Sequence, residues 1–312
     1  MITTKIYANA VAKYNEGKLL GEEFLRRLAD AEFSDAVRLL CEKGYGGGAA
    51  DEKSYDADAF ISRETAALLS YAVTDAPNEY LSRVLTNPFL YGNAKAYYKA
   101  RYTGGNAAVY EMDDEAVRKG IESREYVSLP PFMADALAEL DATFENEEPN
   151  PKTIDALLTN ACYRDSLYCA KKSRQRKLVL YVGVKIDLMN LLSVLRARAL
   201  QASWESVSPL IIEGGKRLKP EALQELFAGD DSVVPESYES LIHASGNLPQ
   251  AEAIADDITA SVFAADCENM QSYAPFIHYF TAQLSEYRAV KTILVCLKNN
   301  ARDEIAARLR RS

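Results

Sequence analysis

The segment NLLSVLRAR (residues 190–198) has a counterpart in NAKAYYKAR (residues 93–101), and this repeat decides the fold. Both segments begin with Asn and end in a triplet of a basic residue followed by Ala and Arg, and they lie about 97 residues apart. A weaker copy, EYRAVK (residues 286–291), shares with DLMNLL (residues 187–192) an acid at its first position. Because a repeat of long period fixes the architecture, the sequence predicts three similar modules of about a hundred residues. We place them at residues 1–102, 103–199 and 200–312.

Helix signals recur along the chain, and strand signals do not. The sequence has 45 alanines but only 15 glycines and 11 prolines, a balance that favours helix. No run of about four to eight residues alternates cleanly between apolar and polar, so no strand is required. The sequence predicts an all-α protein.

Several prolines stand where helices are expected to begin. A proline in the first turn of a helix loses no hydrogen bond, and a preceding Asn caps the helix. On this basis helices are predicted to begin at Asn87-Pro88, Asn150-Pro151, Pro220, Pro249 and Pro275.

Composition and charge limit the class of protein. The chain of 312 residues is 48% hydrophobic and 26% charged, which is typical of a soluble folded protein. Its net charge of −9 repels a phosphate backbone, so nucleic acid is not an expected partner. Five cysteines without a CxxC pair indicate buried hydrophobic residues in a reducing compartment. No secretory signal or uncharged apolar run of about 18 residues is present, so we expect a cytoplasmic protein that is not inserted in a membrane.

The usual catalytic motifs are missing. The chain has two histidines, His243 and His278, no Glu-x-x-His and no P-loop. The acid pair Asp113-Asp114 lies beside a helix start, where carboxylates complement the helix dipole. We therefore expect no catalytic residue, no cofactor and no metal site.

The densest basic run comprises Lys171, Lys172, Arg174, Arg176 and Lys177. It is compatible with contact to anionic lipid headgroups or to an acidic partner, and we favour a solvated helix face.

Asn190 is the most unusual polar residue, because it lies among Leu188, Met189, Leu191 and Leu192. A buried amide needs hydrogen-bond partners, so Asn190 is predicted to tie its helix to a neighbouring loop or terminus.

Three parts of the chain together resemble the C subunit of the V-type and A-type rotary ATPases, known as the d subunit in eukaryotes. YANAVAKYNEGKLL (residues 7–20) is similar to the opening helix of that family, and residues 187–198 are similar to its acid-x-x-Asn, Leu-Arg-Ala-Lys/Arg helix. Residues 276–280, 286–295 and 304–310 are similar to its closing helix and tail.

This sequence departs from the family pattern at three positions. Leu90 stands where the first module would carry the acid, and Ala289 where Asn is common. Lys291 stands where an Arg is usual.

The resemblance implies a non-catalytic central-rotor subunit. Such a subunit is a funnel of three pseudo-equivalent helical modules with approximate threefold symmetry, on the cytoplasmic side of the membrane. It is a socket that couples the central stalk of the soluble head to the membrane ring that carries ions, for ATP-driven ion transport or ATP synthesis. The stalk subunits and the ring would be its partners, with no nucleic acid and no small-molecule substrate.

The motif positions are expected to hold helices together, and some of them to reach a partner: Tyr7, Asn9, Asn93, Arg101, Asp187, Asn190, Arg196, Arg198 and Glu286. Two other readings stay open. One is a generic α-helical repeat scaffold that binds a protein partner, although its expected period of about 30 to 50 residues is shorter. The other is an all-α enzyme with an undetected site.

Overall fold

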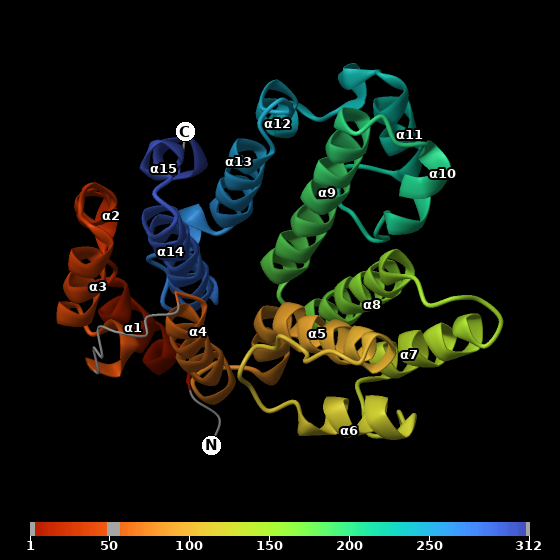
Figure 1. Cartoon of the computed structure of the whole chain (residues 1–312), viewed down its shortest axis with the longest axis horizontal. Coiled ribbons are helices and arrows are strands. Elements are labelled where there is room, and N and C mark those ends of the chain that lie inside the picture. The colour runs from red at the N-terminus through yellow and green to blue at the C-terminus, as the bar shows by residue number, and fades with distance from the viewer. Residues whose placement is uncertain (1–3, 49–56, 310–312) are drawn as a thin grey trace. The chain divides into compact units, whose positions relative to one another are not determined.

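The computed structural model describes residues 4–48 and 57–309, and every regular element in these two ranges is a helix (Figure 1). This confirms the all-α prediction. The chain divides into two compact units. Unit 1 combines Met1–Pro77 with Phe263–Ser312, and unit 2 is Asn78–Val262.

Unit 1 joins both ends of the chain around one long helix. Its elements are α1 (Lys5–Glu16), α2 (Gly21–Asp30), α3 (Phe33–Glu42), η1 (Tyr45–Gly48), α4 (Ala57–Thr74), η5 (Ala264–Asp266), α14 (Ala274–Lys298) and α15 (Arg302–Leu309). Helix α14 packs against α1, α2, α3, α4 and α15. Helix α1 buries two small residues, Ala8 and Ala12, which allow its backbone to approach α14 closely. On α4, Tyr71 stacks on Phe276 of α14 with ring centroids 4.9 Å apart.

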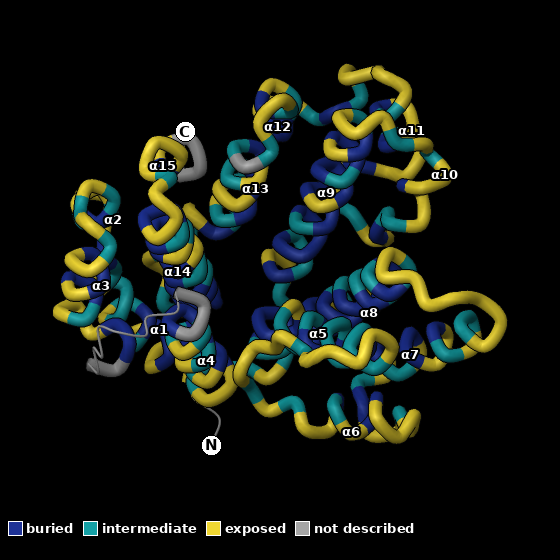
Figure 2. Tube along the Cα trace, in the orientation of Figure 1, coloured by how far each residue is buried: buried dark blue, intermediate teal, exposed yellow. Residues whose placement is uncertain are grey.

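Unit 2 contains two hydrophobic clusters. Its elements are α5 (Glu79–Thr103), α6 (Glu115–Ser123), α7 (Pro131–Phe144), α8 (Pro151–Lys172), α9 (Arg176–Ala199), α10 (Trp204–Val207), η2 (Ser208–Leu210), α11 (Pro220–Ala228), η3 (Asp231–Val233), η4 (Glu236–Tyr238), α12 (Glu239–His243) and α13 (Leu248–Ser261). One cluster lies among α5, α6, α7 and α8, and includes Tyr91, Tyr98, Leu137 and Leu158. The other surrounds α9 with α11, α12 and α13, and includes Leu191, Leu223 and Leu241. Figure 2 shows the buried stretches of these helices in dark blue.

The three longest helices have nearly equal lengths: α5 and α14 have 25 residues, and α9 has 24. Helix α5 begins at Glu79 and α9 at Arg176, so Asn93 and Asn190 occupy the same position in their helices. The segments whose sequences repeat are therefore also alike in local structure.

Four of the five helix starts predicted from prolines are confirmed. Helices α8, α11, α13 and α14 each have a proline in their first two positions. The start at Asn87-Pro88 is wrong, because α5 begins nine residues before Pro88, at Glu79, and runs through it. The N-cap is Asn78, whose Oδ1 accepts from the backbone of Tyr80 at 2.8 Å. Burial of side chains such as Leu81 on the first turns of α5 outweighs the hydrogen bond that Pro88 removes.

Helix α9 is the one helix within residues 4–48 and 57–309 that is long and apolar enough to cross a membrane. However, 72% of its most apolar stretch is buried inside the protein, as in the core helix of a soluble protein.

Three cysteines are buried: Cys162, Cys169 and Cys296. Burial raises the pKa of the Cys162 and Cys169 thiols to about 12, so at neutral pH both are packing groups rather than nucleophiles.

Candidate functional site

Asn190 of α9 binds both polar groups of one residue in the following loop. Its side chain is buried, its Nδ2 donates to the carbonyl oxygen of Ile212 at 2.8 Å, and its Oδ1 accepts from the amide of Ile212 at 2.8 Å. These bonds satisfy the buried amide and the buried peptide together. They confirm the prediction that Asn190 ties its helix to a loop.

Asp187 holds the same loop further along. It lies one turn before Asn190 on the same face of α9, and its side chain is fully buried. It accepts hydrogen bonds from the amides of Arg217 at 2.8 Å and Leu218 at 3.1 Å, and from the hydroxyl of Tyr238 at 3.1 Å. Desolvation raises the pKa of Asp187, and these donors oppose that rise. We call Asp187, Asn190 and the loop 212–218 the α9 clamp.

The α9 clamp requires glycine at two positions of the loop. Gly214 has φ +99°, a conformation that side chains disfavour. A Cβ atom on Gly215 would lie 2.3 Å from Oδ1 of Asp187. Helix α9 contributes a third glycine, because a Cβ on Gly183 would lie 3.1 Å from Cβ of Lys216. The Gly-Gly break in the sequence is therefore the point at which the loop passes directly over a buried carboxylate.

Helix α5 has a similar clamp built with different residues. Asn93 is fully buried, its Oδ1 accepts from the amide of Tyr110 at 2.7 Å, and its Nδ2 donates to the carbonyl oxygen of Tyr110 at 2.8 Å. Leu90 occupies the position that corresponds to the acid. The carboxylate comes instead from the loop, because Asp114 accepts from Asn93 at 2.6 Å and from the hydroxyl of Tyr97 at 3.0 Å.

In unit 1, Glu286 of α14 is the buried acid. It accepts hydrogen bonds from the backbone amide of Leu20 at 2.5 Å, from Nε2 of Gln283 at 2.9 Å and from the hydroxyl of Tyr45. Leu20 precedes α2 as Leu218 precedes α11, so both acids hold the backbone just before a short helix. The acid of α14 thus binds a backbone amide from the N-terminal part of the chain, whereas the acid of α9 binds backbone amides from the loop that follows α9.

Asn9 of α1 supplies a buried amide in unit 1. Its Nδ2 donates to the carbonyl oxygens of Met270 at 2.8 Å and Ser272 at 2.9 Å. These carbonyls lie in the segment that leads into α14, where Ala289 replaces the amide found on the other long helices.

Arg101 lies near the end of α5 and joins two elements of the same cluster. Its guanidinium donates to the carbonyl oxygen of Ile121 at 3.3 Å and to Oδ1 of Asp141 at 3.1 Å. Asp141 also accepts from the hydroxyls of Tyr98 at 2.8 Å and Tyr126 at 2.6 Å. This network links α5, α6 and α7.

The remaining motif residues lie at the surface. Arg196 pairs with Glu252 of α13 at 2.7 Å, and Arg198 pairs with Asp231 of η3 at 2.6 Å. Both pairs connect α9 to segments that follow it, but solvent screens them. The side chain of Tyr7 is 60% exposed.

Sequence reasoning missed an ion pair between α5 and α8 in which the acid is buried and the arginine is partly exposed. Arg83 donates to both carboxylate oxygens of Asp165, at 2.7 and 3.0 Å, and the Asp165 side chain is fully buried. The hydroxyl of Tyr91 also contacts Asp165, at 3.3 Å. One signal was present: an acid flanked at helical spacing by Cys162 and Cys169 lies on an apolar face.

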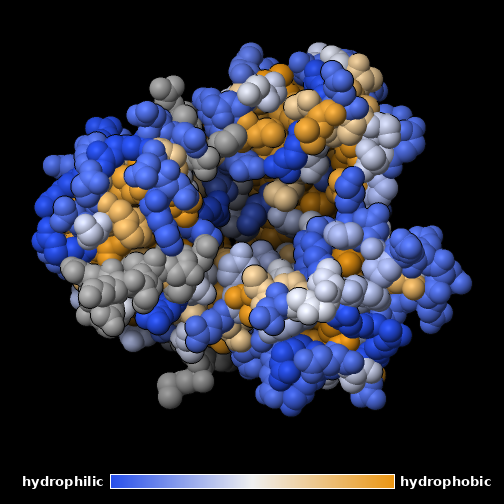
Figure 3. Space-filling model, in the orientation of Figure 1, coloured by the Kyte–Doolittle hydropathy of each residue, from blue (hydrophilic) through white to orange (hydrophobic). Residues whose placement is uncertain are grey.

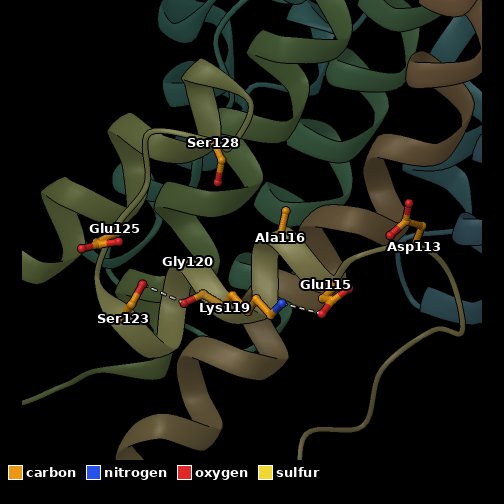
Figure 4. Close-up of a pocket in the computed structure, with 8 residues that line it drawn as sticks. All are labelled: Asp113, Glu115, Ala116, Lys119, Gly120, Ser123, Glu125 and Ser128. Carbon is orange, nitrogen blue, oxygen red and sulfur yellow. Dashed lines mark hydrogen bonds and ion pairs between the residues drawn. The ribbon is translucent and has the colours of Figure 1, made fainter.

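The surface of α6 carries an open hollow of about 450 Å³ (Figure 4). It is lined by Asp113, Glu115, Ala116, Lys119, Gly120, Ser123, Glu125 and Ser128. Lys119 pairs with Glu115 at 2.6 Å, and Figure 3 shows mostly hydrophilic side chains over this helix. The hollow thus presents acidic groups to solvent, without a nucleophile and base in contact.

Neither histidine belongs to a catalytic constellation. His278 Nδ1 lies 3.4 Å from Glu16, and His243 is exposed. Across the described ranges, no group of three or more His, Cys, Asp or Glu side chains is arranged to hold a metal ion. The side chains of Asn93, Asp187, Asn190 and Glu286 hold backbone segments against the long helices.

Comparison with known proteins places this architecture among ATP synthase subunits. The family model of the ATP synthase (C/AC39) subunit matches residues 8–308. The C subunit of the V-type ATP synthase of Thermus thermophilus is 27% identical over 241 residues, which cover 74% of this chain and 73% of that protein. The C subunit of the A-type ATP synthase of Thermococcus onnurineus is 25% identical over 227 residues, 67% of this chain and 61% of that protein. Its counterpart in Methanobrevibacter smithii is 23% identical over 245 residues, 72% of this chain and 62% of that protein.

Proposed function

The chain belongs to the ATP synthase (C/AC39) subunit family, and from this premise we propose that it is the central-rotor socket of a V/A-type ATPase. It is a structural subunit of that complex rather than a catalytic one. In this role it receives the foot of the central stalk on one side. On the other side it rests on the membrane ring that carries ions, at the cytoplasmic face of the membrane.

The observation that carries the proposal is the family match along residues 8–308, together with the way the long helices are built. A socket that transmits torque must be stiff, because any local yielding stores work instead of passing it on. Close-packed interiors transmit strain well. In addition, hydrogen bonds of a buried side chain join α5, α9 and α14 each to a neighbouring segment.

Similar clamps on α5, α9 and α14 also support three pseudo-equivalent modules arranged as a funnel with approximate threefold symmetry. The two separate hydrophobic clusters of unit 2 agree with two such modules within it. We propose that three similar modules around one axis form the seat of the stalk.

The proposal is tested by affinity capture of the tagged chain from gently solubilised membranes, with quantitative mass spectrometry. Head, stalk and ring subunits should be retained in fixed ratios, whereas an unrelated tagged soluble chain at equal abundance should retain none. Deleting the chain should separate the head from the ring, and supplying it again should rejoin them. Recovery of none of these subunits from cells that express the ATPase would reject the socket function and favour a generic helical scaffold.

A further inference from the structure

A strongly basic surface lies at the corner where α8 ends and α9 begins (Figure 1). We call it the basic edge, and it consists of Arg164, Lys171, Lys172, Arg174 and Arg176. All five residues are exposed. Within the part of the chain that the structure describes, none of them forms an ion pair with a carboxylate. The basic edge therefore gathers five exposed cations on a chain whose net charge is −9.

Two aromatic rings lie between cations of the basic edge. The guanidinium of Arg164 lies over the ring of Phe132 at 5.5 Å, and Nζ of Lys172 lies over the ring of Tyr168 at 5.4 Å. The two ring centroids are 5.7 Å apart, and Tyr168 is 44% exposed. Arg164, Tyr168 and Lys172 follow at steps of four residues, so they share one face of α8.

Helix stability does not explain the whole basic edge. Lys171 and Lys172 lie in the last turn of α8, where cations complement the helix dipole. In contrast, Arg176 begins α9, where the dipole disfavours a cation. Arg174 adopts φ +57°, a left-handed conformation that is costly for a residue other than glycine. The helix dipoles therefore do not explain Arg176.

The corner between the two helices is held firmly. The hydroxyl of Ser173 is buried, donates to the carbonyl oxygen of Ala170 at 2.6 Å and accepts from the amide of Gln175 at 3.2 Å. The cations on both sides of Ser173 are thus presented from a fixed backbone, which lowers the entropy cost of binding a surface.

We propose that the basic edge binds the anionic headgroups of a lipid membrane. Clustered Lys and Arg with an aromatic side chain at their level are the features that bind peripheral proteins to such membranes. A protein partner would instead need an apolar core to its interface, and the one large apolar side chain exposed here is Tyr168. The overall charge of −9 does not prevent this binding, because charges farther away than about 8 Å are screened at physiological salt.

The test measures partition of the full chain onto vesicles by cosedimentation. Vesicles in which about a third of the lipid is phosphatidylserine and the rest phosphatidylcholine provide the anionic surface. Vesicles of pure phosphatidylcholine are the reference. Replacing Lys171, Lys172, Arg174 and Arg176 by Gln should lower the partition coefficient several-hundredfold, because each cation near the surface contributes about fivefold. The double variant Arg174→Gln/Arg176→Gln should lower it about 25-fold and serves if the quadruple variant folds poorly.

A matched control replaces four other exposed cations, Arg26, Arg27, Lys152 and Lys219, by Gln and so reaches the same net charge. It should bind like the unmodified chain. The proposal is overturned if phosphatidylserine does not increase binding, or if control and edge variants lose binding equally. It is also overturned if the edge variants keep vesicle binding but lose binding to a polyglutamate peptide, which would identify an acidic protein partner. Because the assay contains no other protein of the complex, its outcome does not depend on the socket function.

Discussion

Replacing Gly215 by alanine tests whether the α9 clamp contributes the rigidity that we attribute to it. The new Cβ would lie 2.3 Å from Oδ1 of Asp187 and 3.1 Å from the carbonyl oxygen of Leu218. The carboxylate must then move and weaken its bonds to the amides of Arg217 and Leu218. A hydrogen bond to a charged group contributes about 1.5–3 kcal/mol, so we expect a loss of about 2–4 kcal/mol in the free energy of unfolding.

The fluorescence of Trp204 during urea unfolding is the appropriate assay. Trp204 is the only tryptophan of the sequence and packs against the cluster that includes Leu191, so it reports on unit 2. A thermal midpoint lower by about 4–16 °C should accompany the loss, at about 2–4 °C per kcal/mol for a unit of this size.

Two comparisons decide whether the clash with Asp187 is the cause. Gly246→Ala is the control, because a Cβ there meets nothing within 4 Å, and it should leave stability nearly unchanged. In an Asp187→Ala background, Gly215→Ala should cost less than about 1 kcal/mol, because the clashing carboxylate is gone. A cost below about 0.5 kcal/mol in the unmodified chain, or equal costs in both backgrounds, would refute the reasoning.

Four further predictions follow from other contacts. Asn93→Leu should destabilise the protein by about 1–3 kcal/mol in chemical unfolding, because it removes both hydrogen bonds to the backbone of Tyr110 and the one to Asp114; a loss below about 0.5 kcal/mol would contradict this. Arg83→Ala should cost about 2–3 kcal/mol, because the buried Asp165 then loses its partly exposed counter-charge, whereas Arg198→Ala, whose acid is exposed, should cost under about 1 kcal/mol; equal losses would show that burial of the acid does not separate the two pairs. Desolvation raises the pKa of Tyr163 to about 12, so its neutral form stabilises the folded state fully below the ordinary value of 10, and this contribution is lost as the pH rises from 10 to 12. In the Tyr163→Phe variant, the free energy of unfolding should therefore fall less steeply between pH 10 and 12, because unfolding releases up to one proton fewer. Urea unfolding at each pH measures this slope, and an unchanged slope would place Tyr163 in solvent. Asn190→Asp loses the donor to the Ile212 carbonyl and buries a second carboxylate one turn from Asp187, so at neutral pH it should destabilise at least as much as Asn190→Leu; a clearly smaller loss in urea unfolding would contradict this.

The helical class was predictable because it depends on local information. Apolar residues at spacings of three and four, such as Leu188, Leu191 and Leu195, lie buried along α9 as expected. Asn190 was also predictable, since an amide inside an apolar stripe must find partners. Pro88 was misjudged because packing on both sides of it, and not the residue itself, decides whether a helix continues.

The partners of the buried acids were not predictable from the sequence. Asp187 contacts backbone amides about 30 residues ahead, and Glu286 contacts Leu20 at the opposite end of the chain. Backbone groups have no residue-specific signature, so no pattern identifies which amide a carboxylate will meet. The Gly214-Gly215 pair indicated a break in the sequence, but its close approach to Asp187 appears only in three dimensions.

The substitutions that weaken the repeat are explained by where each clamp obtains its polar groups. Helix α5 has Leu90 in place of an acid, and the loop supplies Asp114 to the same amide. Helix α14 has Ala289 in place of an amide, and Asn9 of α1 binds the segment that leads into α14. A buried backbone group needs a partner of suitable geometry but does not require that partner to come from a given element. The long helices α5, α9 and α14 are therefore held by hydrogen bonds of the same kind, although the residues that make these bonds come from different elements.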